Sequence, residues 1–366
     1  VARAAMESGV ATRAIEDFDA YLEKLDRFVF RSGLLMRPLF DQARADKKRI
    51  VYAEGEDERV LRAAKAVIDE GVGIPILIGR PKIVQRRVER LGLNFKPGED
   101  CEIINPQDDP RYRDYWQLYH SLAERKGVSP DEARTRVRTN STVIAALALM
   151  RGDADAMICG TEGRYDRHLQ HVQDVIGQRD GVQDLSAVSV LILSKGTIFI
   201  TDTYVTPNPT VAEIAEMTHL AAEEVRRFGL VPKVALLSHS NFGSSNSDSA
   251  QKMRAARKLV HERDPNLQVE GEMHADAAID PELRARIFPS SVLEGQANLL
   301  VMPDQDAANI AFNLLKTLAD GLAVGPILVG AERSAHVLTP SVTARGILNM
   351  SAVAAVGAQY DARARG

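Results

Sequence analysis

A polar loop in the second half of the chain carries the residue types best suited to bind a ligand. It lies between the apolar run 233–237 and a helical pattern that begins near Asp248, with hydroxyl and amide side chains crowded around Gly243. Neutral donors between a strand end and a helix start can hold a phosphate group. The candidate ligand-binding residues here are Ser238, Ser240, Asn241, Ser244 and Asn246. Loops of this composition are also often only solvated, so both interpretations stay open.

Four further candidates follow other apolar runs. Asp304 and Asn309 come after the run 297–302, and Thr339 and Arg345 lie beyond the run 325–330. Ligands of parallel sheets bind outside the carboxyl ends of the strands, so residues in such loops are candidates by position. Asp and Asn are equally common as turn formers, which leaves a structural role open.

The sequence offers little for a metal or a nucleotide. It contains no G-x-x-x-x-G-K-[ST], no G-x-G-x-x-G and no H-E-x-x-H pattern. His168 and His171 have the spacing of one helix face and could share a metal, but no carboxylate pattern accompanies them. A surface or hydrogen-bonded pair is favoured. We therefore expect no metal site and no bound cofactor in this chain.

Composition limits the class of protein. The 366 residues are 45% hydrophobic and 26% charged, as in ordinary soluble domains. A net charge of −4 argues against a nucleic-acid or anionic-membrane partner, and no apolar run reaches the length of a membrane span. The two cysteines, Cys101 and Cys159, exclude a disulfide framework and a Cys-based zinc site. These features predict a cytoplasmic protein.

Short apolar runs alternate with helical patterns from residue 49 onward. The predicted strands are 49–53, 74–79, 155–160, 187–193, 197–201, 233–238, 297–302 and 325–330. Residues 194–196 join two of them as a hairpin. Capping boxes are predicted at Ser129 with Glu132 and at Thr210 with Glu213. This alternation predicts an α/β protein with mostly parallel sheets.

Residues 1–36 differ from the rest of the chain. Ile15, Phe18, Leu22, Leu25 and Phe28 recur at helical spacing between charged residues. The segment is either an N-terminal helix packed on its own domain or a helical connector from an upstream domain. The chain opens with Val inside a helical pattern, so we expect a connector and a longer polypeptide.

Several segments, in this order, resemble phosphotransacetylases (phosphate acetyltransferases). They are AEGEDERVLRAA (53–64), AERKGVSPDEA (123–133), DADAMICG (153–160), PKVALLSHS (232–240), DAAI (276–279), VMPDQDAAN (301–309) and GPILVG (325–330). The resemblance implies two α/β domains, the second inserted in the first, with a ligand cleft between them and a homodimer. Domain I is then 37–180 and 325–366, and domain II is 181–324.

The opening residues ARAAMESGVATRAIEDFDAY (2–21) are similar to the closing segment of bacterial malic enzymes. A malic enzyme followed by a phosphotransacetylase-like domain is the architecture of multidomain, or hybrid, malic enzymes. This resemblance places NAD(P) and Mg²⁺ or Mn²⁺ in an upstream domain, outside the present chain.

The resemblance also shows where the family's catalytic residues are missing. The family carries Ser-Arg-Gly with an aspartate six residues after the arginine. Here Thr339, Pro340 and Gly346 stand at the serine, arginine and aspartate positions. Two further family arginines fall on Gln170 and Ala123. Arg345, Arg164 and Arg167 are near in sequence and could compensate.

The sequence therefore predicts a chain without catalytic residues, whose ligand is acetyl-CoA acting as an effector. Its partners would be its own malic enzyme domain and a second copy, with a higher homo-oligomer in the full chain, and neither nucleic acid nor membrane. The intact chain would be an NAD(P)-dependent malic enzyme that converts malate to pyruvate and CO₂. The alternatives are an active phosphate acetyltransferase and a purely structural oligomerisation module.

Overall fold

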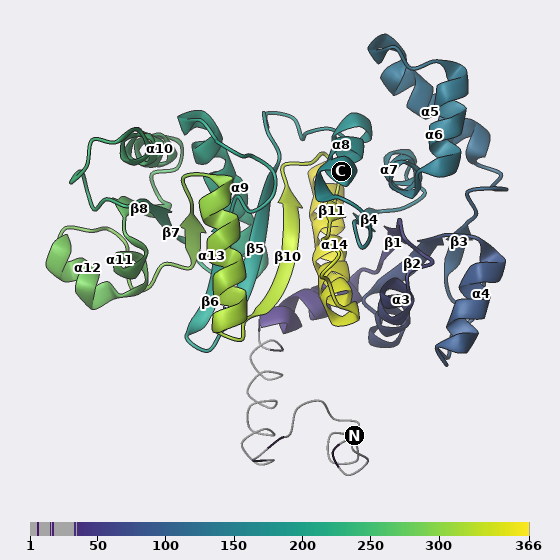
Figure 1. The fold of residues 1–366 in the computed structure, drawn as a ribbon, viewed down its shortest axis with the longest axis horizontal. Helices are drawn as coiled ribbons and strands as arrows, with labels where there is room; N and C mark the ends of the chain where they lie inside the picture. The colour runs from purple at the N-terminus through teal and green to yellow at the C-terminus, as the bar shows by residue number, and fades with distance from the viewer. Residues whose placement is uncertain (1–5, 7–14, 16, 18–32, 34, 366) are drawn as a thin grey trace.

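The computed structural model describes residues 6, 15, 17, 33 and 35–365 (Figure 1). Most of the connector predicted over 1–36 lies outside these residues, so that prediction stays open. Residues 35–45 are helical. This helix is called the connector helix below, although all of it beyond residue 36 lies in the predicted domain I.

The first sheet contains five parallel strands. Their order is β11 (Ala335–Val337), β4 (Ala156–Cys159), β1 (Lys48–Tyr52), β2 (Gly73–Ile78) and β3 (Glu102–Ile104). The helices that belong to this part are α3 (Glu58–Glu70), α4 (Pro81–Arg90), α5 (Tyr112–Ala123), η1 (Glu124–Lys126), α6 (Pro130–Thr139), α7 (Ser141–Arg151), α8 (Tyr165–Val175) and α14 (Ala344–Arg365). Alternation of strands and helices is what forces neighbouring strands to run parallel.

The second sheet contains six strands and one reversal of direction. Their order is β10 (Leu322–Val329), β5 (Ser186–Leu193), β6 (Gly196–Thr201), β9 (Leu299–Val301), β7 (Lys233–Leu237) and β8 (Gln268–Met273). Strand β5 runs antiparallel to both of its neighbours, and the remaining pairs are parallel. The accompanying helices are α9 (Val211–Arg227), α10 (Asp248–Arg263), α11 (Ala275–Ile279), α12 (Pro281–Ile287) and α13 (Gln305–Leu318).

The α/β class and the hairpin of β5 and β6 are confirmed. The boundary predicted between residues 324 and 325 falls inside β10, because this strand pairs with β5 along the second sheet. Strand β8 was not expected, since its sequence QVEGEM places two glutamates in a buried strand. The short strands β3 and β11 were also missed.

The two predicted capping boxes differ in outcome. At α9 both hydrogen bonds between Thr210 and Glu213 are formed. At α6 the Ser129 hydroxyl accepts the Glu132 N–H, but the Glu132 carboxylate binds Arg136 instead of returning to the cap. Only the first half of that prediction is correct.

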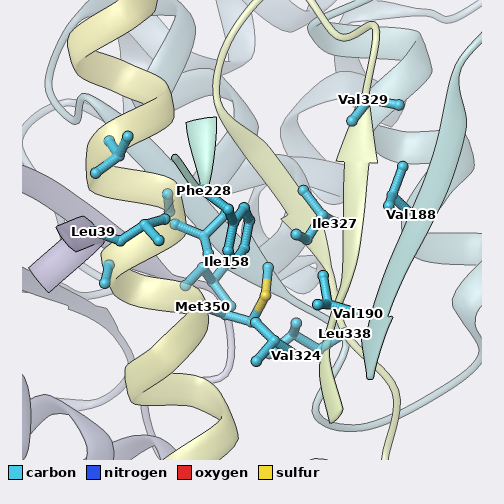
Figure 2. Packing of buried hydrophobic residues seen from close by; sticks show 14 of the residues in the cluster. Leu39, Ile158, Val188, Val190, Phe228, Val324, Ile327, Val329, Leu338 and Met350 are labelled. Carbon is cyan, nitrogen blue, oxygen red and sulfur yellow. The ribbon is translucent and has the colours of Figure 1, made fainter. Parts of the chain in front are cut away.

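One apolar core joins the two sheets. Figure 2 shows Leu39, Ile158, Val190, Ile327 and Met350 meeting where the sheets approach each other. Helix α14 lies between the sheets in Figure 1, and its residues from Ile347 to Gln359 are all buried. A helix that is apolar on every side belongs in an interior, which explains its position. The two halves of the chain are therefore packed against one common helix.

Candidate functional site

A pocket of about 160 Å³ lies between helix α13, the first half of β10 and the segment that follows β11. We call it the cleft pocket. Its walls are Tyr204, Phe312, Asn313, Lys316, Gly321, Leu322, Ala323, Gly325, Pro326, Thr339, Ser341, Val342, Thr343 and Gly346. One wall therefore comes from β10 of the second sheet and from α13. The other wall comes from the segment after the carboxyl end of β11, a strand of the first sheet.

The cleft pocket is almost free of charge. Lys316 is the single cation among the described residues that line it, and none of those residues is Asp, Glu or His. Hydroxyl groups of Tyr204, Thr339, Ser341 and Thr343 provide most of its polarity. Such a pocket can hold a neutral polar group through hydrogen bonds. It has neither a guanidinium for a phosphate dianion nor a side chain that could accept a proton from a thiol.

Only some of the positions at which family catalytic residues are replaced lie at the cleft pocket. Thr339 and Gly346 line the cleft pocket, and Pro340 is exposed beside it. Gln170 is exposed on α8, where its amide donates to Asp174 at 3.1 Å. Ala123 is 7% exposed and packs in the core at the end of α5.

Arg59 lies close to Pro340, but its guanidinium is fully engaged. It donates to both carboxylate oxygens of Asp57 and to the carbonyl oxygen of Thr161. Its Nη1 also donates to the carbonyl oxygens of Pro340 and Val342, at 2.6 and 3.2 Å. Five donors are thus used within the protein, and none is left for a bound anion. Arg59 fixes the wall of the cleft pocket.

The arginines considered as replacements are directed elsewhere. The Arg345 guanidinium lies 5.8 Å from the centre of the Phe40 ring and is absent from the pocket lining. Arg164 forms two hydrogen bonds to Asp166 at the exposed start of α8. Arg167 is exposed. Neither Arg164 nor Arg167 lines the cleft pocket.

A buried carboxyl group lies at the carboxyl ends of β1 and β4. Glu54 has 11% of its side chain exposed and accepts the Gly160 N–H at 3.1 Å. Burial raises the pKa of Glu54 to about 7, although the backbone hydrogen bonds act in the opposite direction. Gly160 has a positive φ of 90°, and a Cβ here would lie 2.5 Å from the Leu338 carbonyl oxygen. This turn therefore requires glycine.

Most polar groups of the loop after β7 are hydrogen-bonded within the protein. One carboxylate oxygen of Glu272, a residue that is 0% exposed, accepts from the Ser240 hydroxyl, the Gly243 N–H and Arg254, at 2.8–2.9 Å. The Asn241 amide oxygen accepts the His274 N–H.

The remaining members of that loop are mostly engaged as well. Ser244 accepts the Asn241 N–H, and Asn246 accepts from Arg254. The Ser238 hydroxyl is buried and has no partner among the described residues. These contacts do not favour a phosphate seat, and a ligand role for these five residues stays a prediction.

The other two loop candidates, Asp304 and Asn309, lie at α13 and do not line the cleft pocket. Asp304 caps α13 by accepting the Ala307 N–H at 2.8 Å, which is a structural role. Asn309 donates to the carbonyl oxygen of Thr203, next to Tyr204 of the pocket wall. The Tyr204 ring packs on the Tyr165 ring with centroids 4.9 Å apart, so the two halves of the chain also touch here. Sequence reasoning missed Lys316, Tyr204, Ser341 and Thr343.

The histidine pair makes hydrogen bonds within the protein. The ring nitrogens of His168 contact the Thr142 hydroxyl and the Glu162 carbonyl oxygen, and His171 contacts Asn140. No group of three or more metal-binding side chains occurs within the described residues.

Among the residues that the structure describes, no helix is long and apolar enough to cross a membrane.

Comparison with known proteins gives a consistent set of relatives. A family model described as phosphate acetyl/butaryl transferase matches residues 34–355. The NAD-dependent malic enzyme of Rhizobium meliloti is 58% identical over 361 residues, covering 98% of this chain and 47% of that protein. The NADP-dependent malic enzyme of Escherichia coli is 51% identical, covering 98% of this chain and 47% of that protein. The chain thus spans somewhat less than half of these malic enzymes.

Two relatives match over nearly their whole length. The phosphate acetyltransferase of Clostridium acetobutylicum is 32% identical, covering 89% of this chain and 98% of that protein. Among solved structures, the EutD phosphotransacetylase from Staphylococcus aureus superposes with a TM-score of 0.81 and 28% identity. That match covers 90% of this chain and 99% of the EutD chain.

Proposed function

The chain belongs to the phosphate acetyl/butaryl transferase family, and we propose that it is a non-catalytic member that senses acetyl-CoA for a malic enzyme. The observation that carries this proposal is the lining of the cleft pocket, which has neither an arginine nor a carboxylate among the described residues. Thr339 and Gly346 line it at positions where the family resemblance implies serine and aspartate, and Pro340 beside it stands at the arginine position.

The magnitude of the loss supports a non-catalytic role. Removal of one preorganised charge-stabilising group typically slows an enzyme by about 10²–10³-fold. Losses of several such groups are not additive, but together they leave little turnover. Arg59 cannot take their place, because its donors already bind Asp57 and three carbonyl oxygens.

A thioester of coenzyme A fits the pocket better than inorganic phosphate does. The hydroxyl groups of Thr339, Ser341 and Thr343 can donate to a thioester carbonyl or a pantetheine amide, and Lys316 can approach one phosphate. None of these contacts requires a proton acceptor. The pocket would thus bind the effector and leave it unchanged.

The relatives supply the second half of the proposal. In the proteins named above, the matching sequence forms part of NAD- or NADP-dependent malic enzymes. We propose that this chain is likewise part of an NAD(P)-dependent malic enzyme and that acetyl-CoA changes its activity. NAD(P) and the divalent metal would then bind in the other part, since the described residues contain no group fit for a metal.

Two measurements on the purified chain test this proposal. In calorimetry with acetyl-CoA we expect saturable binding, and a flat titration would contradict it. In a coupled assay with acetyl phosphate and CoA we expect no turnover above the buffer blank. Robust turnover would instead establish an active phosphate acetyltransferase. The Clostridium acetobutylicum phosphate acetyltransferase serves as the positive control.

A second function, homodimer formation, is favoured by the surface of α13. Ile310, Leu314 and Leu318 are 58%, 54% and 81% exposed, and their spacing places them on one face of the helix. The stripe is symmetric about Leu314, so a twofold axis would pair Ile310 with Leu318 of a second copy. Such self-complementarity is what an isologous interface requires. We propose that two copies meet along α13.

A further inference from the structure

The connector helix, residues 35–45, is attached to the rest of the chain by its apolar face. Leu35, Met36, Leu39, Phe40 and Ala43 are each at most 9% exposed. Figure 2 shows Leu39 within the core beside α14. The helix therefore cannot shift without disturbing that core, because interiors are close-packed.

Gln359 of α14 binds the end of the connector helix. Its amide nitrogen donates to the carbonyl oxygens of Gln42 and Asp46, at 2.9 and 2.8 Å. The last carbonyl groups of a helix have no partner within the helix, so these bonds complete its C-terminus. Gln359 is 1% exposed, which makes the two bonds costly to lose.

The opposite end of α14 lies at the cleft pocket. Gly346, in its first turn, lines the pocket, and its N–H donates to the Thr343 hydroxyl of the pocket wall. The neighbouring Arg345 lies over the Phe40 ring of the connector helix. A single buried helix thus touches the pocket with one end and holds the connector helix at two places.

From these contacts we infer that α14 couples occupancy of the cleft pocket to the connector helix, with Gln359 as the positioning residue. The inference rests on the proposed function, since it names the route by which a ligand acts. A ligand that contacts Thr339, Thr343 or Gly346 in the pocket wall shifts the first turn of α14. The shift reaches residues 40–46 through Arg345 and Gln359.

Hydrogen exchange of the amides of residues 35–46, with and without acetyl-CoA, tests the coupling. In the wild-type chain we expect the ligand to change their exchange about fivefold, the lower range of allosteric couplings. In Gln359→Leu we expect acetyl-CoA to bind with its affinity within about twofold, while the change at residues 35–46 is lost. Gln85→Leu, the same replacement at an exposed site on α4, should behave as the wild type. A ligand effect that persists in Gln359→Leu overturns the inference.

Two further variants test the coupling independently of Gln359→Leu. If circular dichroism shows that Gln359→Leu does not fold, the exposed Arg345→Gln takes its place, with the same expectation. The variant Gly346→Ala tests the coupling in the absence of a ligand. Its Cβ would lie 2.9 Å from Val342 Cγ2, so the pocket wall would have to move. We expect it to alter exchange at residues 35–46 on its own, and unchanged exchange overturns the coupling. Failure of acetyl-CoA to bind the wild type contradicts the proposed function alone.

Discussion

The carbonyl oxygen of Pro340 accepts a hydrogen bond from Arg59 at 2.6 Å. The residue that stands at a family arginine position is thus itself held by an arginine from α3. The same guanidinium binds Asp57, whose side chain is 7% exposed. This contact keeps the wall of the cleft pocket in place and also explains why a nearby cation cannot serve a ligand.

Replacement of Arg59 by leucine should destabilise the chain strongly. The replacement leaves the buried Asp57 carboxylate without its cation. It also removes the Arg59 hydrogen-bond donors from the carbonyl oxygens of Thr161, Pro340 and Val342. Loss of one partner from such a group costs about 2–4 kcal/mol. Urea unfolding measures the loss. The exposed Arg164→Leu, which gives up only its pair with Asp166, should leave the stability nearly unchanged.

Lys316 should strengthen effector binding through its charge. It is the single cation among the described residues lining the cleft pocket, so Lys316→Gln should weaken acetyl-CoA binding by about tenfold. The effect should shrink as salt is added, because screening weakens the pair. Calorimetry at two salt concentrations measures both effects. Lys195→Gln, in the exposed hairpin turn, should leave the affinity unchanged, and equal losses in the two variants would exclude a local role.

Glu54 should make stability depend on pH. Burial raises the pKa of Glu54 to about 7 in the folded chain, against an ordinary value of 4.5. Its contribution is therefore fully present below pH 4.5 and is lost as the pH rises through 7. Between pH 5 and 8 the wild type should lose about 2 kcal/mol more than Glu54→Gln, in which position 54 does not titrate. Urea unfolding of both chains at the two pH values gives the difference, and parallel pH profiles would contradict it.

The sequence predicted the parts of the fold that depend on local signals. The hairpin of β5 and β6 follows from two apolar, β-rich runs joined by a short turn, and the cap at Thr210 follows from residue spacing. Strand β8 gave no such signal, because Glu270 and Glu272 are buried only through contacts with other segments. Glu272 takes hydrogen bonds from the loop after β7 and from Arg254, and neither could be foreseen from its own neighbours.

The site was predictable only where a motif marked it. The segment from Thr339 to Gly346 was located by resemblance, and five of its residues, among them Thr339 and Gly346, line the cleft pocket. Lys316 reaches the same pocket from the end of α13, more than twenty residues earlier, and no pattern in the sequence links the two. Composition also could not show that the donors of the polar loop are used within the protein. Hydrogen-bond partners of that kind are set by tertiary packing.

The exposed stripe on α13 gives the last prediction. Leu314 lies at its centre, so in a twofold dimer it faces its own copy, and Leu314→Asp would place two carboxylates against each other without partners. Sedimentation should show the wild type as a dimer and Leu314→Asp as a monomer with unchanged circular dichroism, because the side chain is 54% exposed in one copy. Val231→Asp, at a residue that is 67% exposed outside the stripe, controls for surface charge and should remain dimeric. If both variants dimerise, the interface lies elsewhere. If the wild type is monomeric, the proposal that two copies meet along α13 is contradicted.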